Sequence, residues 1–280
     1  HQQNTLLRTR NASPQGSYEA TLQNITSLVE QAEKQLGLSD TPVGIGIPGT
    51  ISRKTGCVKN ANSTWLNGQP LEQDLSRLLN RKIKVTNDAN CLAVSEAVDG
   101  AGQGHDLVFA AILGTGCGAG IAYQQQAFVG PNGLAGEWGH ITHPTASDSA
   151  KQLRPCYCGK YGCIENFISG TGLQLSYQQL SGKATNGQTI ATLAEQGDGI
   201  ARQALTQFQQ QVVDALALVV NLLDPDIIVL GGGASNIQSL YPFIQQHLAN
   251  ATFGKECDTQ VVQSQHGDSS GVRGAAWLNL

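Results

Sequence analysis

The chain has 280 residues, of which 40% are hydrophobic and 14% charged, with a formal net charge of -4 and a pI near 5.8. Nucleic-acid phosphates would repel such an acidic surface, and no apolar run is long enough to cross a bilayer. We therefore expect a cytoplasmic protein of two modest domains, with neither a nucleic acid nor a membrane as its partner.

The predicted elements alternate between strands and helices. In chain order they are a helix over 18–36, strands over 43–47 and 83–86, a helix over 91–98, strands over 107–113 and 121–123, a helix over 200–223, a strand over 227–230, a helix starting at Asn236 and a terminal helix over 270–278. Helices are inferred from apolar residues that recur every three or four positions, and strands from short apolar runs that end at glycine or proline. This order indicates an α/β fold with ligands at the carboxyl ends of its strands.

Two glycine-rich segments follow predicted strands. The first, Gly114 to Gly120, has the pattern G-T-G-x-G-x-G, and its backbone amides could approach a nucleotide phosphate. The second, Gly231-Gly232-Gly233, could lie against a ribose or a flat ring. A tight turn explains each segment equally well, because neither matches a Walker loop or a dinucleotide fingerprint.

Asp88 is the residue that we favour as a catalytic base. It stands at the end of a predicted strand between Asn87 and Asn90, whose amides could hold a polyol while the carboxylate accepts a hydroxyl proton. The alternative interpretation is that Asp88 caps the helix that follows, a common role for Asp at such a place.

A compact metal-binding pattern occupies the middle of the chain. His140 and the cysteines of a C-x-C-G-x-x-G-C stretch, Cys156, Cys158 and Cys163, can surround one zinc ion. Four protein ligands leave no open coordination position, so this zinc would be structural. The alternative is three unrelated thiols and a core histidine. His143 is a lower-ranked rival ligand.

Glu137 and Glu165 flank this cluster in the sequence. Glu137 precedes His140 by three residues, and Glu165 follows Cys163 by two. We expect the zinc to position both carboxylates to accept hydrogen bonds from sugar hydroxyls, with His140 keeping one nitrogen on the metal.

These motifs resemble the ROK family of bacterial sugar kinases and repressors. The resemblance rests on Gly136-Glu137-Trp138-Gly139-His140, the segment from Cys156 to Glu165, Asn87-Asp88-Ala89-Asn90, Gly114-Thr115-Gly116, the triple glycine and His266-Gly267-Asp268. Within the family, the segments 59–68 and 155–158 look most similar to proteobacterial fructokinases, also called manno(fructo)kinases.

The resemblance implies an actin/hexokinase-like fold made of two ribonuclease-H-like domains with a cleft between them. The small domain would span 1–110 and be completed by the helix 269–280, and the larger one, with the zinc site, would span 111–268. The family pattern implies Asp88 as the base, and as sugar contacts it implies Gly49, Asn62, Asn87, Asp88, Glu137, His140 and Glu165. The implied ATP contacts are Gly114, Thr115, Gly116, Gly118, Gly231, Gly232 and Gly233.

The leading sequence-based hypothesis is an ATP- and Mg²⁺-dependent fructokinase that makes fructose 6-phosphate, with mannose as a second acceptor. By analogy with the family, we expect a homodimer. The alternatives are an N-acetylhexosamine kinase or glucokinase of the same family, or a sugar-sensing repressor without catalysis. Repressors of this family carry a helix-turn-helix ahead of the sugar domain, for which this chain has no room. Family kinases open with a D-x-G-G-T loop that this sequence lacks, and we expect that loop to belong to missing upstream residues.

Overall fold

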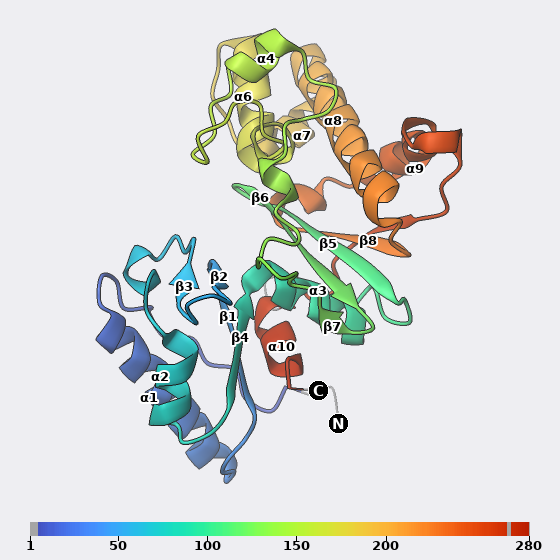
Figure 1. Ribbon diagram of the computed structural model, residues 1–280. Coiled ribbons are helices and arrows are strands. Elements are labelled where there is room, and N and C mark those ends of the chain that lie inside the picture. The colour runs from blue at the N-terminus through green and yellow to red at the C-terminus, as the bar shows by residue number, and fades with distance from the viewer. Residues whose placement is uncertain (1–4, 268–269, 280) are drawn as a thin grey trace.

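Parallel strand pairs organise both halves of the molecule (Figure 1). The computed structural model describes residues 5–267 and 270–279. The N-terminal half contains the parallel pair of β1 (Val43–Ile47) and β4 (Ile83–Asn87), and the short antiparallel pair of β2 (Thr50–Ile51) and β3 (Val58–Lys59).

The second half contains a mixed sheet of five strands in the order β7-β6-β5-β8-β9. Its members are β5 (Leu107–Leu113), β6 (Cys117–Tyr123), β7 (Gln126–Ala127), β8 (Ile227–Gly231) and β9 (Gln260–Gln263). Because β5 and β8 run in parallel, their carboxyl ends meet at one edge, and each is followed there by a glycine turn. This is the edge at which α/β sheets usually bind ligands.

Helices cover both faces of the five-stranded sheet. The α-helices are α1 (Tyr18–Leu36), α2 (Leu71–Leu78), α3 (Asp88–Asp99), α4 (Asp148–Gln152), α5 (Glu165–Ile168), α6 (Gly170–Ser181), α7 (Gly187–Glu195), α8 (Gly199–Leu223), α9 (Leu240–Ala251) and α10 (Ser270–Trp277). Short 3₁₀ turns lie at η1 (Thr64–Leu66), η2 (Trp138–His140), η3 (Gly233–Asn236) and η4 (Phe253–Lys255). None of the helices in the described part of the chain is long and apolar enough to cross a membrane.

The alternation of side chains along β5 explains how one strand serves two cores. Val108 and Ala110 face α3, whereas Phe109, Ala111 and Leu113 join the larger core beneath α8. All five are buried, as expected for an apolar strand covered on both faces. The near-continuous apolar run from 107 to 113 is therefore what places this strand at the centre of its sheet.

Most predicted elements are confirmed, with two corrections. The glycine-rich segment after β5 was expected to stay a loop as far as Gly120, but β6 already begins at Cys117 and pairs with β5 along its whole length. Only 114–116 form the turn. The helix expected at Asn236 is a 3₁₀ turn, η3, that ends there, and α9 begins at Leu240.

The backbone of α3 lies directly against the backbones of β6 and α10. A Cβ on Gly120 of β6 would lie 2.1 Å from the carbonyl oxygen of Ala89, and one on Gly274 of α10 would lie 1.6 Å from that of Cys91. Gly44 of β1 approaches the backbone of α10 equally closely. The first turns of α3 are thus held between the large sheet and α10, and α10 in turn is held on the small sheet (Figure 1).

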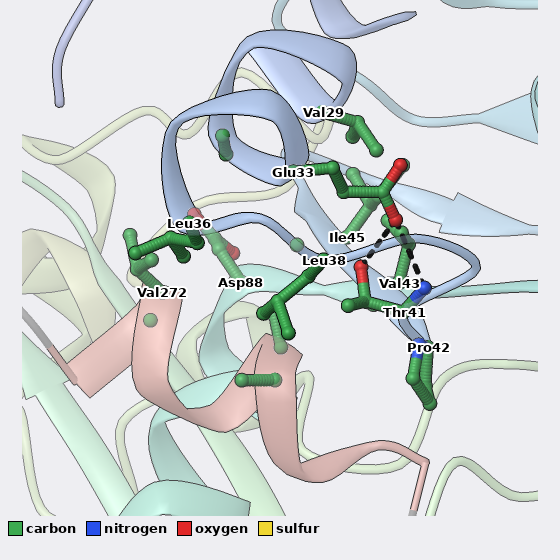
Figure 2. A pocket seen from close by; sticks show the side chains of 16 residues that line it. Val29, Glu33, Leu36, Leu38, Thr41, Pro42, Val43, Ile45, Asp88 and Val272 are labelled. Carbon is green, nitrogen blue, oxygen red and sulfur yellow. Dashed lines mark hydrogen bonds between the residues drawn. The ribbon is translucent and has the colours of Figure 1, made fainter. Parts of the chain in front are cut away.

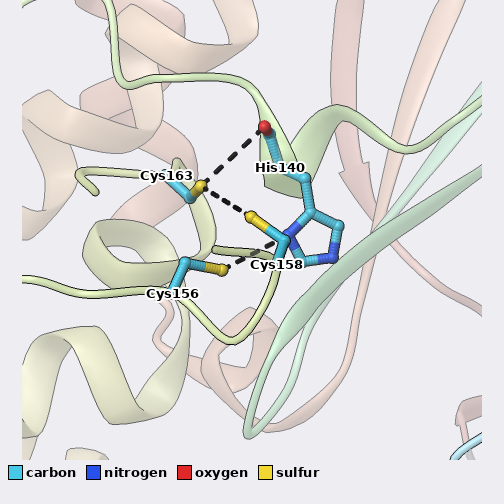
Figure 3. Close-up of side chains that lie close together, drawn as sticks. All are labelled: His140, Cys156, Cys158 and Cys163. Carbon is cyan, nitrogen blue, oxygen red and sulfur yellow. Dashed lines mark hydrogen bonds between the residues drawn. The ribbon is translucent and has the colours of Figure 1, made fainter. Parts of the chain in front are cut away.

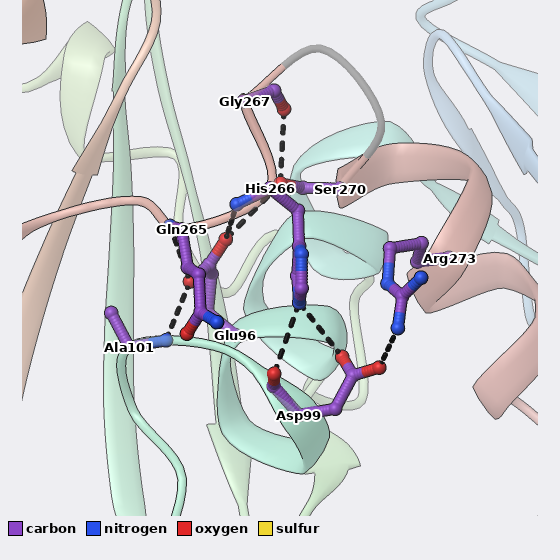
Figure 4. A network of polar contacts seen from close by, with 8 residues as sticks. All are labelled: Glu96, Asp99, Ala101, Gln265, His266, Gly267, Ser270 and Arg273. Atoms are coloured by element: carbon purple, nitrogen blue, oxygen red, sulfur yellow. Dashed lines mark hydrogen bonds and ion pairs between the residues drawn. The ribbon is translucent and has the colours of Figure 1, made fainter. Parts of the chain in front are cut away.

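A polar network fixes the other end of α3 (Figure 4). Glu96 is fully buried, and its carboxylate accepts a hydrogen bond from the backbone N–H of Gln265, at 3.1 Å. Asp99 pairs with Arg273 and with Nε2 of His266, the latter at 3.2 Å. Buried carboxylates need such partners. The network therefore ties the segment that enters α10 to α3.

The terminal helix packs on α3 and on β1, as the sequence predicts. Asp268 of the expected family motif, and residues 269 and 280 of the expected terminal helix, lie outside the described residues. The division into a domain of 1–110 with 269–280 and a domain of 111–268 stays a prediction.

Gly274→Ala is expected to lower the free energy of unfolding by about 1–3 kcal/mol, because the added methyl group would overlap the backbone of α3. Gly271→Ala is the matched control, since a Cβ at that position of α10 meets nothing within 4 Å. Denaturant titration compares the two variants. Equal unfolding midpoints would show that α3 and α10 are not in the close contact described.

Candidate functional site

Asp88 is the first residue of α3 and follows β4 directly. The helix cap is its neighbour Asn87, whose side-chain oxygen accepts a hydrogen bond from the N–H of Ala89 at 2.8 Å. Asp88 Oδ1 accepts from the same N–H, also at 2.8 Å. The alternative interpretation, in which Asp88 caps α3, is therefore wrong, because Asn87 is the cap residue. Asn87 also donates to the carbonyl oxygen of Gly49, at 3.1 Å.

The Asp88 side chain lies at the end of an apolar groove of about 560 Å³ between α1, β1 and α10 (Figure 2). Desolvation raises the pKa of Asp88, and the hydrogen bond from Ala89 opposes that rise. The residue is nevertheless exposed to solvent, which limits the effect of desolvation. We therefore expect an ionised carboxylate at neutral pH, as a general base requires.

His140, Cys156, Cys158 and Cys163 come together in space, with one ligand atom from each lying within 4.8 Å of the others (Figure 3). Cys156 Sγ lies 3.5 Å from His140 Nδ1, and Cys158 Sγ lies 3.6 Å from Cys163 Sγ. The edges of a tetrahedron around zinc are about 3.8 Å for sulfur ligands, given Zn–S bonds of about 2.3 Å. The donor set and its spacing therefore fit a structural zinc ion.

Local chain pairing forms this cluster. Isolated bridges join Pro155 to Tyr161 and Thr142 to Cys163, so the cysteine loop closes on itself and on the segment after His140. The rival ligand His143 does not take part. It is fully buried, and its Nε2 lies 3.1 Å from the carbonyl oxygen of Gln211 in α8.

The segments that carry the two flanking carboxylates are both hydrogen-bonded to the start of β6. Glu165 begins α5, and its Oε2 accepts a hydrogen bond from the N–H of Cys117 at 3.0 Å. Glu137 is exposed and immediately precedes Trp138, whose Nε1 donates to the carbonyl oxygen of Gly118 at 3.1 Å. Two adjacent residues of β6, Cys117 and Gly118, thus anchor the segments that carry the two acids.

The remaining expected sugar contacts belong to the small sheet. Gly49 follows β1 with a positive φ of 89°, and a Cβ there would lie 2.6 Å from the carbonyl oxygen of Lys59. Asn62 is exposed just beyond that point of contact. The hydrogen bond from Asn87 to Gly49 connects this region to the start of α3.

A second cavity, of about 640 Å³, opens at the glycine-turn edge of the large sheet. Gly114 and Thr115 line it from the β5–β6 turn, Gly233 and Asn236 line it from η3, and α6 and α7 form the other wall. Its size suits a nucleotide.

The other expected ATP contacts do not line this cavity. Gly116 instead adjoins Glu165, because a Cβ there would lie 2.5 Å from Glu165 Oε2. Gly118 lies within β6 and pairs with Ile112. Gly231 is buried in β8, and Gly232 packs against the backbone at the end of β5, where a Cβ would meet Leu113 at 2.6 Å.

The start of α6 is a part of the cavity that sequence reasoning missed. Ser169 caps this helix, Gly170 donates its N–H to the carbonyl oxygen of Gly114 at 2.7 Å, and the Thr171 hydroxyl donates to that of Thr115 at 2.8 Å. The amino end of a helix attracts anions. The run Ser169-Gly170-Thr171-Gly172 is the sequence signal that could have indicated it.

Comparison with known proteins decides the family. The model of the ROK family matches residues 1–280. The chain belongs to the ROK family. The N-acetyl-D-glucosamine kinase of Vibrio cholerae is 36% identical over 275 residues, which cover 97% of this chain and 91% of that protein.

Solved structures agree with this assignment. The ROK hexokinase from Thermus thermophilus superposes with a TM-score of 0.83 at 25% identity, covering 95% of this chain and 87% of that one. A glucokinase from Streptomyces griseus, solved with glucose and AMPPNP, has a TM-score of 0.73 at 29% identity and covers 95% and 89%. This ROK protein therefore has the actin/hexokinase-like fold that the sequence predicts.

Proposed function

We propose that this ROK protein is an ATP-dependent sugar kinase whose acceptor is N-acetylglucosamine. The observation that carries the kinase assignment is the turn 114–116. Gly114 and Thr115 line the nucleotide-sized cavity, while Gly116 adjoins Glu165, one of the two acids expected to bind sugar. The nucleotide and the acceptor would thus bind on the two sides of one short turn. Phosphoryl transfer requires the two ligands to lie this close together.

The choice of sugar rests on the relatives. The sequence motifs favour fructose as the acceptor, but relatives with 36% identity over nearly the whole chain are N-acetylglucosamine kinases. We therefore replace fructose by N-acetylglucosamine as the leading acceptor. Glucose and mannose share the same ring hydroxyl chemistry and are the natural competitors.

The proposed mechanism uses Asp88 to accept the proton of the acceptor hydroxyl as that oxygen attacks the terminal phosphate of ATP. Asn87 holds the start of α3 in place through its bonds to Ala89 and Gly49. Gly114 and Thr115 of the turn, with Gly170 and Thr171 at the start of α6, line the cavity that would receive the phosphates. Mg²⁺ bound with ATP would neutralise charge on the transferred phosphoryl group.

We further propose that His140, Cys156, Cys158 and Cys163 hold a structural zinc ion. Burial raises the pKa of the Cys163 thiol to about 12, so a bound cation is what would keep this sulfur ionised. The zinc would fix the loop between Glu137 and Glu165, and these two carboxylates would then accept hydrogen bonds from sugar hydroxyls. The cytoplasmic location and the homodimer expected from the sequence stay predictions.

A sugar panel in an assay of ADP formation tests the function. We expect the highest kcat/KM with N-acetylglucosamine, and lower values with glucose, mannose and fructose. A preference for fructose would restore the motif-based hypothesis for the acceptor. Sugar binding without ADP formation from any hexose would instead indicate a sensor and overturn the kinase proposal.

Asp88→Asn is expected to lower kcat by a factor of about 10²–10⁴ while sugar binding is retained, because an amide cannot accept the hydroxyl proton. Asp148→Asn on the exposed α4 is the control and should leave kcat unchanged.

Since desolvation raises the pKa of Asp88, the protonated, inactive form persists to higher pH than for an ordinary Asp. The fall of kcat/KM on acidification should accordingly begin above the ordinary carboxyl range and be absent from the residual activity of the variant. Near-normal turnover by Asp88→Asn would exclude it as the base.

Elemental analysis of the purified protein should find about one zinc ion per chain. Cys158→Ser, at the exposed member of the cluster, should lose zinc and raise the KM for sugar, because the loop between the two acids loosens. Cys57→Ser, at a cysteine outside the cluster, should keep both values. A zinc-free protein with full sugar affinity would show that the metal has no scaffolding role.

A further inference from the structure

The two ring nitrogens of His140 have different neighbours. Nδ1 lies toward Cys156, on the side of the metal cluster. A histidine that binds a metal through Nδ1 carries its proton on Nε2, which is then a hydrogen-bond donor. Nε2 is therefore the atom through which His140 would contact a sugar hydroxyl.

In the structure this donor already has a partner. The hydroxyl oxygen of Tyr157 lies 2.9 Å from His140 Nε2. The two rings meet edge to face, with centroids 5.0 Å apart and planes at 86°. Tyr157 belongs to the cysteine loop, between two of the expected zinc ligands, and its position is thus fixed by the same loop that fixes His140.

The ring of Tyr157 is otherwise poorly packed, since the residue is 80% exposed. A large aromatic residue gains little from such a position, so the edge-to-face contact and the hydroxyl contact with His140 are what hold the side chain there. An exposed hydrogen bond of this kind is weak and easily exchanged for another.

The phenol hydroxyl has the same hydrogen-bonding capacity as a sugar hydroxyl, because it can both donate and accept. It can therefore occupy the place of a sugar hydroxyl on His140 Nε2, at the distance of 2.9 Å that the structure shows.

We propose that Tyr157 determines sugar affinity and selectivity by competing with the substrate: its hydroxyl takes the place of one sugar hydroxyl on His140 Nε2 and must leave when the sugar binds. This inference rests on the proposed function, because it requires that His140 contacts a sugar. The side chain can leave without disturbing the core, since it is exposed and its departure breaks one hydrogen bond.

The competition has a consequence for selectivity. A sugar with a hydroxyl at the position facing His140 replaces the lost phenol contact with an equivalent one. A deoxy sugar that lacks this hydroxyl cannot do so, and leaves the phenol in place on Nε2. Removing the phenolic oxygen should therefore help only those sugars that carry the hydroxyl.

The test is calorimetric titration of the zinc-loaded protein with N-acetylglucosamine and with glucose, in the absence of ATP. Tyr157→Phe keeps the ring and removes the competing oxygen, so the Kd should fall by a factor of about two to ten, the equivalent of one exposed hydrogen bond. Tyr161→Phe is the matched control, because Tyr161 is a second exposed tyrosine of the same loop, and its Kd should equal that of the unmodified protein. Zinc content is measured for each protein to establish that the loop is intact.

A tighter Kd is a result that mere damage to the loop would not produce. An unchanged Kd in Tyr157→Phe would show that the hydroxyl does not compete, and a weaker Kd would show that it contacts the sugar directly. Either result overturns the proposal. Repeating the titrations with the 2-, 3-, 4- and 6-deoxy derivatives of glucose should identify one whose Kd is the same in both proteins, which names the hydroxyl that faces His140.

The same experiment separates this inference from the proposed function. If the unmodified protein binds a hexose and forms ADP with it, the function holds and the ratio of the two Kd values alone decides the role of Tyr157. If the unmodified protein binds no hexose, the proposed function fails, and the inference fails with it.

Discussion

The contact of α3 with two other backbones is the constraint on which the rest of the structure depends. Gly120 on one side and Gly274 on the other leave no room for even a methyl group, so the first turns of the helix cannot shift without moving a sheet or α10. Protein interiors packed at this density transmit displacement rather than absorb it. The position of Asp88, at the first residue of this helix, is thereby set by both halves of the molecule.

The large sheet supplies the complementary constraint on the two ligands. Its central strand, β5, ends at a turn that contributes to the nucleotide-sized cavity, and the strand that leaves this turn, β6, anchors the segments of Glu137 and Glu165. The two ligands proposed here would therefore be positioned from opposite ends of one three-residue turn. A zinc ion in the His140 cluster would stiffen the sugar side, where the backbone has little regular structure of its own.

Local features of this chain could be predicted from its sequence, and contacts between distant segments could not. The apolar run of β5 and the periodicity of α1 and α8 identify those elements, and the cysteine cluster is visible because three of its four residues lie within eight positions. Gly118 and Gly120 were assigned to a loop because a glycine that allows close packing looks the same in sequence as one that forms a turn. Gly120 lies within β6, and a glycine is needed there because the backbone of α3 packs directly against it. The wall that α6 and α7 add to the cavity, and the approach of Tyr157 to His140, depend on tertiary folding and leave little local trace.

A crystal structure with N-acetylglucosamine and a non-hydrolysable ATP analogue would test most directly whether the start of α3 presents the base to both ligands. We expect one sugar hydroxyl within about 2.6–3.2 Å of a carboxylate oxygen of Asp88 and directed at the terminal phosphate. The adenosine should lie between η3 and the helices α6 and α7. A sugar bound with none of its hydroxyls near Asp88, or a nucleotide bound away from the turn 114–116, would contradict this account.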